Sequence, residues 1–94
     1  MRERQLRGAA LARAAAYFSR RPEFLGQLLR GTGKSDAELC AALACDVEAL
    51  HRACLCFRPR PERHAEDVEA IGRACGIDPE RLARVVEELE AAAE

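Results

Sequence analysis

The stretch Ser35–Leu55, SDAELCAALACDVEALHRACL, decides the fold, because it predicts two short helices joined by a tight corner. Ser35 and Glu38 have the spacing of a capping box, in which the serine hydroxyl and the glutamate carboxylate satisfy backbone N–H groups at the start of a helix. The first helix is therefore expected to begin at about Asp36 and to stop near Ala44.

A second helix is expected from Val47, because Asp46 offers another N-cap. Apolar residues recur at helical spacing, and those expected to face the core are Leu39, Ala42 and Leu43, then Val47, Leu50, Ala53 and Cys54. The residues expected on the open side of the second helix are Asp46, Glu48, Ala49, His51 and Arg52. Together the two helices have the outline of a helix-turn-helix.

This stretch resembles the lambda-repressor-like (Cro/C1, or XRE) helix-turn-helix family. Cys40 stands where that family usually has a small Ala, Ala44 where the corner Gly lies, and Leu50 where the recognition helix has its buried aliphatic residue. Residues 64–86, HAEDVEAIGRACGIDPERLARVV, resemble the fourth and fifth helices of the family. The resemblance covers about residues 22–89 and implies a fold of five helices.

Composition also favours packed helices over a sheet. Aromatic residues make up 4 % of the chain, Trp is absent, and no segment alternates apolar and polar residues with period two. We therefore expect an all-α chain, a compact bundle of five to six short helices with a helix-turn-helix core. We expect a single domain over 1–94, with an added N-terminal helix in 1–21, the core in 22–90 and a frayed tail in 91–94.

Local start and stop signals predict the remaining helices and one connection. The expected features are a helix over Gln5–Ser19, a helix with Pro22 at its first position and Gly31 at its end, a helix over His64–Cys75 stopped by Gly76, and a helix with Asp78 as N-cap and Pro79 at its first position. Two prolines predict a stiff, extended connection over Cys56–Arg63 that carries three arginines.

Charge is divided unevenly between the two ends of the chain. Residues 1–34 hold eight basic and two acidic side chains, whereas residues 35–94 hold seven basic and fourteen acidic ones. The two halves could simply attract each other, or the basic end could bind phosphate or an acidic partner. Five cysteines, an odd number, and no apolar segment after Met1 predict a reducing, cytoplasmic location without a membrane helix.

No motif in the sequence predicts catalysis or a cofactor. Gly31–Ser35, GTGKS, resembles the end of a phosphate-binding P-loop, but Leu28 stands where that motif needs a Gly and no strand precedes it. The candidates for a metal site are Cys45, Cys54 and Cys56, but they lack a C-x-x-C pair. We expect no enzyme activity, no cofactor and no bound metal.

Binding is the remaining class of function, and the second helix of Ser35–Leu55 favours a protein as the partner. A DNA-reading helix normally presents Arg, Lys, Gln, Asn, Ser or Thr, whereas Asp46 and Glu48 place carboxylates where phosphates would lie. We expect a non-catalytic regulatory or adaptor module whose contact residues are Glu48, His51, Arg52, Arg58 and Arg60. We expect the partner to be either another protein or a second copy of this chain.

The alternative is a DNA-binding transcriptional regulator of the XRE type, which the resemblance implies. In that family the connection equivalent to Cys56–Arg63 lies close to the DNA backbone. The expected phosphate contacts are Arg2, Arg4, Arg7 and Arg63. Such a regulator would act as a dimer, because one short helix reads too few base pairs.

Overall fold

The computed structural model describes residues 2–31 and 33–93, and the side chains of residues 8–31 and 33–92. Its elements are α1 (Arg2–Phe18), α2 (Leu25–Arg30), α3 (Asp36–Leu43), α4 (Val47–Cys54), the 3₁₀-helix η1 (Pro61–Arg63), α5 (His64–Cys75) and α6 (Pro79–Ala93). The described residues contain no strand, and the radius of gyration is 12.6 Å. The expectation of a compact all-α bundle is confirmed.

Helices α3 and α4 begin at the caps expected from the sequence. Ser35 Oγ accepts a hydrogen bond from the backbone N–H of Glu38 at 3.1 Å, and Glu38 Oε1 accepts one from the N–H of Ser35 at 3.4 Å. Asp46 Oδ1 accepts from the N–H of Ala49 at 2.8 Å. Between the helices Ala44 has a φ of 51°, a left-handed conformation that favours glycine. These local interactions fix the corner between the two helices.

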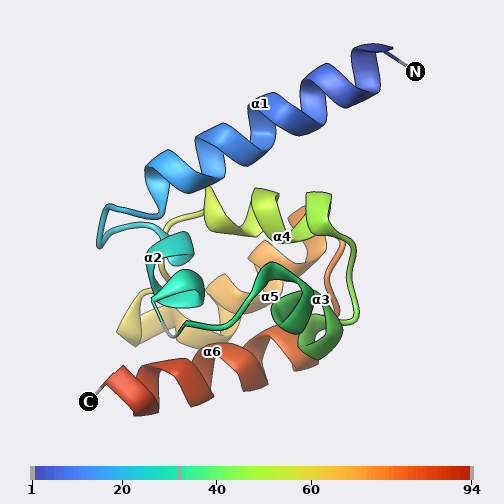
Figure 1. Cartoon of the computed structure of the whole chain (residues 1–94). Helices are drawn as coiled ribbons and strands as arrows, with labels where there is room; N and C mark the ends of the chain where they lie inside the picture. Colours follow the sequence, from blue (N-terminus) through green and yellow to red (C-terminus); the bar gives the residue numbers. More distant parts are fainter. Residues whose placement is uncertain (1, 32, 94) are drawn as a thin grey trace.

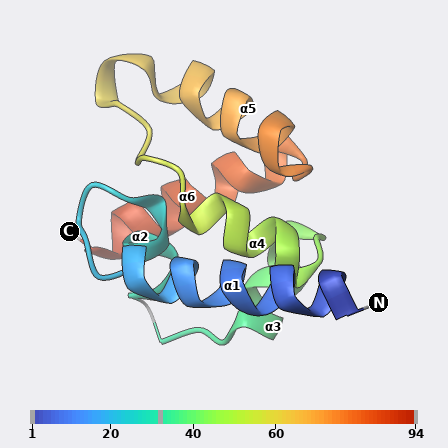
Figure 2. The ribbon, with the colours of Figure 1, turned by 90° about the horizontal axis from the view of Figure 1, so that it is seen from above.

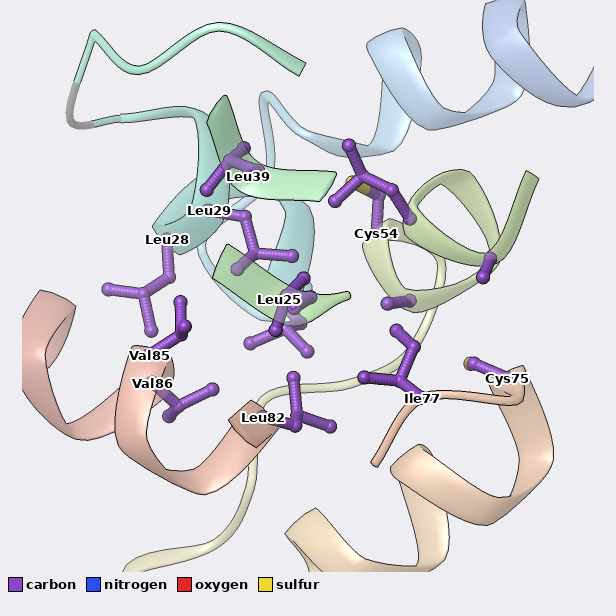
Figure 3. Close-up of a cluster of buried hydrophobic side chains, with 14 of the residues drawn as sticks. Leu25, Leu28, Leu29, Leu39, Cys54, Cys75, Ile77, Leu82, Val85 and Val86 are labelled. Carbon is purple, nitrogen blue, oxygen red and sulfur yellow. The ribbon is translucent and has the colours of Figure 1, made fainter. Parts of the chain in front are cut away.

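Helix α4 lies at the centre of the bundle and packs against α1, α2, α3 and α5. In Figure 2 it lies between α1 and α5. Figure 3 shows the core beside it, built largely from leucine and valine side chains of α2, α3 and α6. The side chains that are almost completely buried are Leu25, Leu29, Leu39, Leu43, Leu50, Leu82, Val68, Val86 and Cys54. Most of the driving force for folding comes from burying these apolar side chains.

Helix α1 lies alongside α4 in both views of the ribbon (Figures 1 and 2), and the two helices run in the same direction. Its covered side consists mainly of small residues, with Ala15 fully buried and Ala12 and Ala14 half-buried. Small side chains let two helices approach closely. Helix α1 is therefore part of the bundle and covers one side of α4.

A second close approach joins α2 to the end of α4 at Gly26. A Cβ atom at Gly26 would lie 2.8 Å from the backbone oxygen of Cys54 and 2.9 Å from its Cβ. Any side chain larger than hydrogen would push the two backbones apart. Glycine at this position is a packing requirement.

The structure corrects several boundaries predicted from the sequence. Pro22 lies in the turn before α2, which begins at Leu25 and not at Pro22. The connection after α4 is extended only as far as Arg60, because Pro61–Arg63 forms η1. The expected fraying at 91–94 is not seen in residues 91–93, which continue α6; Glu94 lies outside the described residues.

The structure also corrects the expected faces of α3 and α4. Ala42 and Val47 were expected in the core, yet Ala42 is exposed and Val47 is 48 % exposed. Ala49 and His51 were expected on the open side, yet both are buried. Ala49 and His51 are buried because α4 packs against four helices, so its buried arc is wider than one apolar stripe.

None of the helices in the described residues is both long and apolar enough to cross a membrane.

Candidate functional site

The connection that follows α4 is held in one conformation by the residues before α2. Its backbone forms an isolated antiparallel bridge in which Phe57 faces Phe24. The N–H of Leu25 donates to the oxygen of Cys56 at 2.8 Å, and the N–H of Arg58 donates to the oxygen of Glu23 at 3.0 Å. We call Leu55–Arg60 the 55–60 loop. It is a fixed surface, which lowers the entropic cost of binding there.

All four aromatic residues of the chain lie in one row beside this loop. Tyr17 packs edge-on against Phe18, with ring centroids 5.3 Å apart, and Phe18 packs against Phe24 at 4.8 Å. Phe24 in turn stacks on Phe57, with ring centroids 5.0 Å apart and an angle of 17° between the rings. Both ends of the row are exposed, Tyr17 by 58 % and Phe57 by 69 %. The row joins α1, the turn before α2 and the 55–60 loop.

A groove of about 790 Å³ opens beside Phe57. Its apolar lining comes from the loop and η1 on one side and from α5 on the other: Phe57, Pro59, Pro61, Ala70 and Ile71. Its charged lining consists of Glu23, Asp67 and Glu90 together with Arg58 and Arg60. The groove therefore combines apolar contact area with charged groups around it.

The loop arginines expected to meet a partner are bound within the chain. Arg58 donates through Nη2 to Gln27 Oε1 at 2.9 Å and is half-buried. Arg60 donates to Asp67 through its backbone N–H at 2.9 Å and through Nε and Nη2 at 2.9 and 3.0 Å. Arg60 holds the pKa of the Asp67 carboxyl well below its usual range through these hydrogen bonds. Arg58 and Arg60 therefore shape the groove.

The residues expected to contact phosphate lie in two separate places, Arg63 in η1 and the other three in α1. Arg63 is exposed and pairs with Glu66 of α5. Arg2, Arg4 and Arg7 belong to α1, but their side chains lie outside the described part of the chain. The structure does not bring Arg63 and the backbone of α1 to one surface, since η1 precedes α5 and α1 lies on the far side of α4 (Figure 2).

Helix α4 offers little free surface to a ligand. His51 is 8 % exposed, and its Nε2 lies 3.4 Å from Asp36 Oδ2, which also accepts from Arg30 at 3.3 Å. Glu48 and Arg52 are the charged groups of α4 that reach the surface, and they pair with each other at 3.5 Å. The five expected contact residues are thus divided between α4 and the 55–60 loop, and His51 serves packing between α3 and α4.

The three cysteines considered for a metal site are not gathered together. Cys45 lies at the corner with Cys40, and burial together with that second thiol raises the Cys45 pKa to about 11. Cys54 is fully buried in the core, whereas the Sγ of Cys56 lies 3.8 Å from the Sγ of Cys75. Among the described residues, no group of three or more His, Cys, Asp or Glu side chains has the arrangement of a metal site.

Phe57 and Tyr17 are surface residues that the sequence analysis did not select. The available signal was that the chain holds only four aromatic residues and that Phe57 stands in a Pro-Arg segment that cannot be helical. An aromatic side chain in such a segment either packs against the rest of the chain or is exposed to solvent, and the sequence alone does not distinguish the two. Here its inner face is packed on Phe24, while most of its surface is displayed.

Comparison of the chain with protein-family models, with curated proteins and with solved structures gives no match.

Proposed function

We propose that this chain is a non-catalytic adaptor or regulatory module that binds a protein partner through Phe57 and the adjoining groove. The observation that carries the proposal is the exposed end of the aromatic row, set beside an apolar groove on a loop that is held by backbone hydrogen bonds. Exposed aromatic side chains on a rigid backbone are typical anchors of protein interfaces.

The enclosure of α4 supports a protein partner over DNA. A helix that reads DNA must place a free face in the major groove and offer donors to bases and phosphates. Helix α1 packs along one side of α4, and the exposed Arg52 is paired with Glu48. Helix α4 therefore lacks the free cations of a DNA-reading helix, despite the resemblance of its sequence to the XRE family.

The groove supports a partner segment that combines an apolar side chain with a basic one. The apolar residues around Phe57 suit an aromatic or aliphatic anchor. Glu23 and Glu90 lie at the groove, and each has one cationic or imidazole neighbour, Arg21 at 3.0 Å and His64 at 2.7 Å. A carboxylate has room for more than one donor, so a Lys or Arg of the partner could pair there. The groove arginines are already bound by Gln27 and Asp67.

A pull-down with nuclease treatment tests the proposal. The chain and two variants, Phe57→Ser and Val47→Ser, serve as baits in lysate of the native cells. Phe57 and Val47 are both exposed apolar residues, but Val47 lies on α4. We expect a protein that is retained by the wild type and by Val47→Ser and is lost with Phe57→Ser. Circular dichroism confirms that each bait is folded.

The same experiment distinguishes the DNA-binding alternative. If DNA is the ligand, nuclease should abolish recovery, affinity should fall steeply with salt, and Glu48→Gln should strengthen binding by removing a repulsion. Recovery of specific DNA fragments without a reproducible protein partner would overturn the proposal.

A further inference from the structure

Two thiols that are far apart in the sequence lie in contact where the 55–60 loop passes the end of α5. Cys56 Sγ lies 3.8 Å from Cys75 Sγ, and it also lies 3.5 Å from the backbone oxygen of Arg52. Figure 3 shows Cys75 at the end of α5, beside Ile77. Cys56 belongs to the bridge that ties the loop to residues 23–25, and Cys75 ends a twelve-residue helix. Both thiols are therefore held on fixed backbone.

The two thiols differ in access to solvent and in acidity. Cys56 is half-buried, whereas Cys75 is 4 % exposed. The hydrogen bond from Cys75 lowers the Cys56 pKa to about 7, against the effect of burial. The same hydrogen bond and burial raise the pKa of Cys75. At neutral pH Cys56 is therefore the thiol of the pair that is both reachable and partly ionised, and Cys75 remains a protonated neighbour.

The other cysteines do not share this combination. Cys54 is fully buried, and its pKa is raised by burial. Cys40 in α3 and Cys45 at the corner are half-buried, but the Cys45 pKa of about 11 keeps that thiol protonated. Cys40 and Cys45, which are five positions apart in the sequence, give an internal comparison for any thiol reaction.

We propose that Cys56 and Cys75 form a thiol modification site, in which Cys56 reacts with a low-molecular-weight disulfide and Cys75 resolves the adduct into an intramolecular disulfide. The contact between the two sulfur atoms and their unequal exposure carry this assignment. The small disulfide reaches Cys56 from solvent, and Cys75 is positioned behind it.

The reaction takes place in two exchange steps. The Cys56 thiolate attacks one sulfur of the small disulfide, whose S–S bond breaks; a mixed disulfide forms and one small thiolate leaves. Cys75 then gives up its proton and attacks the Cys56 sulfur, which releases the second small thiolate. The two protein thiols are oxidised, the small disulfide is reduced to two thiols, and these take up the two protons lost by the protein. The sulfur atoms need to approach by about 1.8 Å to reach a bond length of about 2.0 Å.

Mass spectrometry after incubation with oxidised glutathione tests the proposal. Trypsin should release a cross-linked pair of peptides that contain Cys56 and Cys75, and fragment ions distinguish Cys56 from Cys54 in the same peptide. We expect the cross-link in the wild type and its loss in Cys56→Ser. In Cys75→Ser, we expect glutathione to remain attached to Cys56, because nothing resolves the adduct.

Two further measurements keep the test decisive if a variant folds poorly. In the wild type, brief alkylation at pH 7 should label Cys56 at least roughly tenfold faster than Cys45. Cys40→Ser should leave both the alkylation of Cys56 and the cross-link unchanged. The proposal is overturned if Cys40 and Cys45 cross-link before Cys56 and Cys75, if Cys56 is alkylated no faster than Cys45, or if no cross-link forms in the folded wild type.

Discussion

Helix α4 and the 55–60 loop follow each other in the chain, yet they have opposite roles. In α4 five of eight residues are buried, and its exposed charges Glu48 and Arg52 neutralise each other. In the loop Phe57 is 69 % exposed, while the backbone and Arg58 are bound to the rest of the chain. The loop exposes Phe57 in a fixed position because backbone hydrogen bonds join the loop to residues 23–25. The surface available for binding is thus set by which neighbours cover each segment.

A carboxylate in the core should have the largest effect and test the buried side of α4. Leu50→Asp places an unpaired carboxylate at a fully buried position, which costs several kcal/mol and is comparable with a total stability of about 5–15 kcal/mol. We expect this variant to be largely unfolded. Val47→Asp, on the exposed side, should change stability by less than about 0.5 kcal/mol. Thermal unfolding followed by circular dichroism measures both; similar melting temperatures for the two variants would contradict the assigned faces.

The next effect concerns the contact between α2 and α4. Gly26→Ala brings a methyl group into the backbone of Cys54, so we expect a loss of about 1–3 kcal/mol in the free energy of unfolding. Gly8→Ala in α1 is the matched control, since a Cβ there meets nothing within 4 Å; it should stabilise by up to about 1 kcal/mol. Urea unfolding measures both changes. A stabilising Gly26→Ala would mean that the helices are not in close contact.

A smaller effect of opposite sign is expected at the corner that leads into α4. The left-handed conformation costs Ala44 roughly 1–2 kcal/mol, and glycine at this position would remove that cost. The greater freedom of glycine in the unfolded chain offsets part of the resulting gain in stability. Ala44→Gly should therefore stabilise the fold by up to about 1 kcal/mol. Ala42→Gly, at an exposed position inside α3, should destabilise it by about 1 kcal/mol. Equal effects of the two changes in urea unfolding would rule out the left-handed corner.

The smallest effect is expected at the loop and depends on pH. The folded-state pKa of Asp67 is depressed by Arg60, so its contribution to stability is present above the unfolded-state value of about 4 and is lost as pH falls below it. Asp67→Asn should lower stability slightly at pH 7 and reduce the difference in stability between pH 7 and pH 3. Urea midpoints at the two pH values measure this difference. If it is as large in Asp67→Asn as in the wild type, Asp67 does not contribute through its charge.

Features governed by near neighbours in the sequence were predictable. The caps at Ser35 and Asp46 depend on residues three positions away, and both are confirmed. The bounds of α5 agree with those expected because Gly76, with a φ of 76°, ends the helix. Pro22 was misplaced because the bridge between Phe24 and Phe57, a contact distant in sequence, delays the start of α2.

The candidate site was predicted only in part: the sequence selected the segment that carries Arg58 and Arg60, both of which line the groove, but not the contacts between distant residues that shape it. The sequence selected Arg58 and Arg60 as free cations, but Gln27 and Asp67 reach them only in the folded chain. Helical periodicity placed His51 on the open side of α4, whereas its side chain is buried and lies against Asp36 of α3. Nothing in the spacing of Cys56 and Cys75 indicated that their sulfur atoms meet.

Site-specific photo-crosslinking most directly tests whether Phe57 or α4 meets the partner. A photoreactive phenylalanine analogue replaces Phe57 in one protein and Arg52, also exposed, in another. Both are expressed in the native cells and irradiated. We expect a crosslinked protein from position 57 that is absent from position 52 and persists after nuclease treatment. A crosslink to protein or DNA that forms from position 52 and not from position 57 would contradict docking at the 55–60 loop.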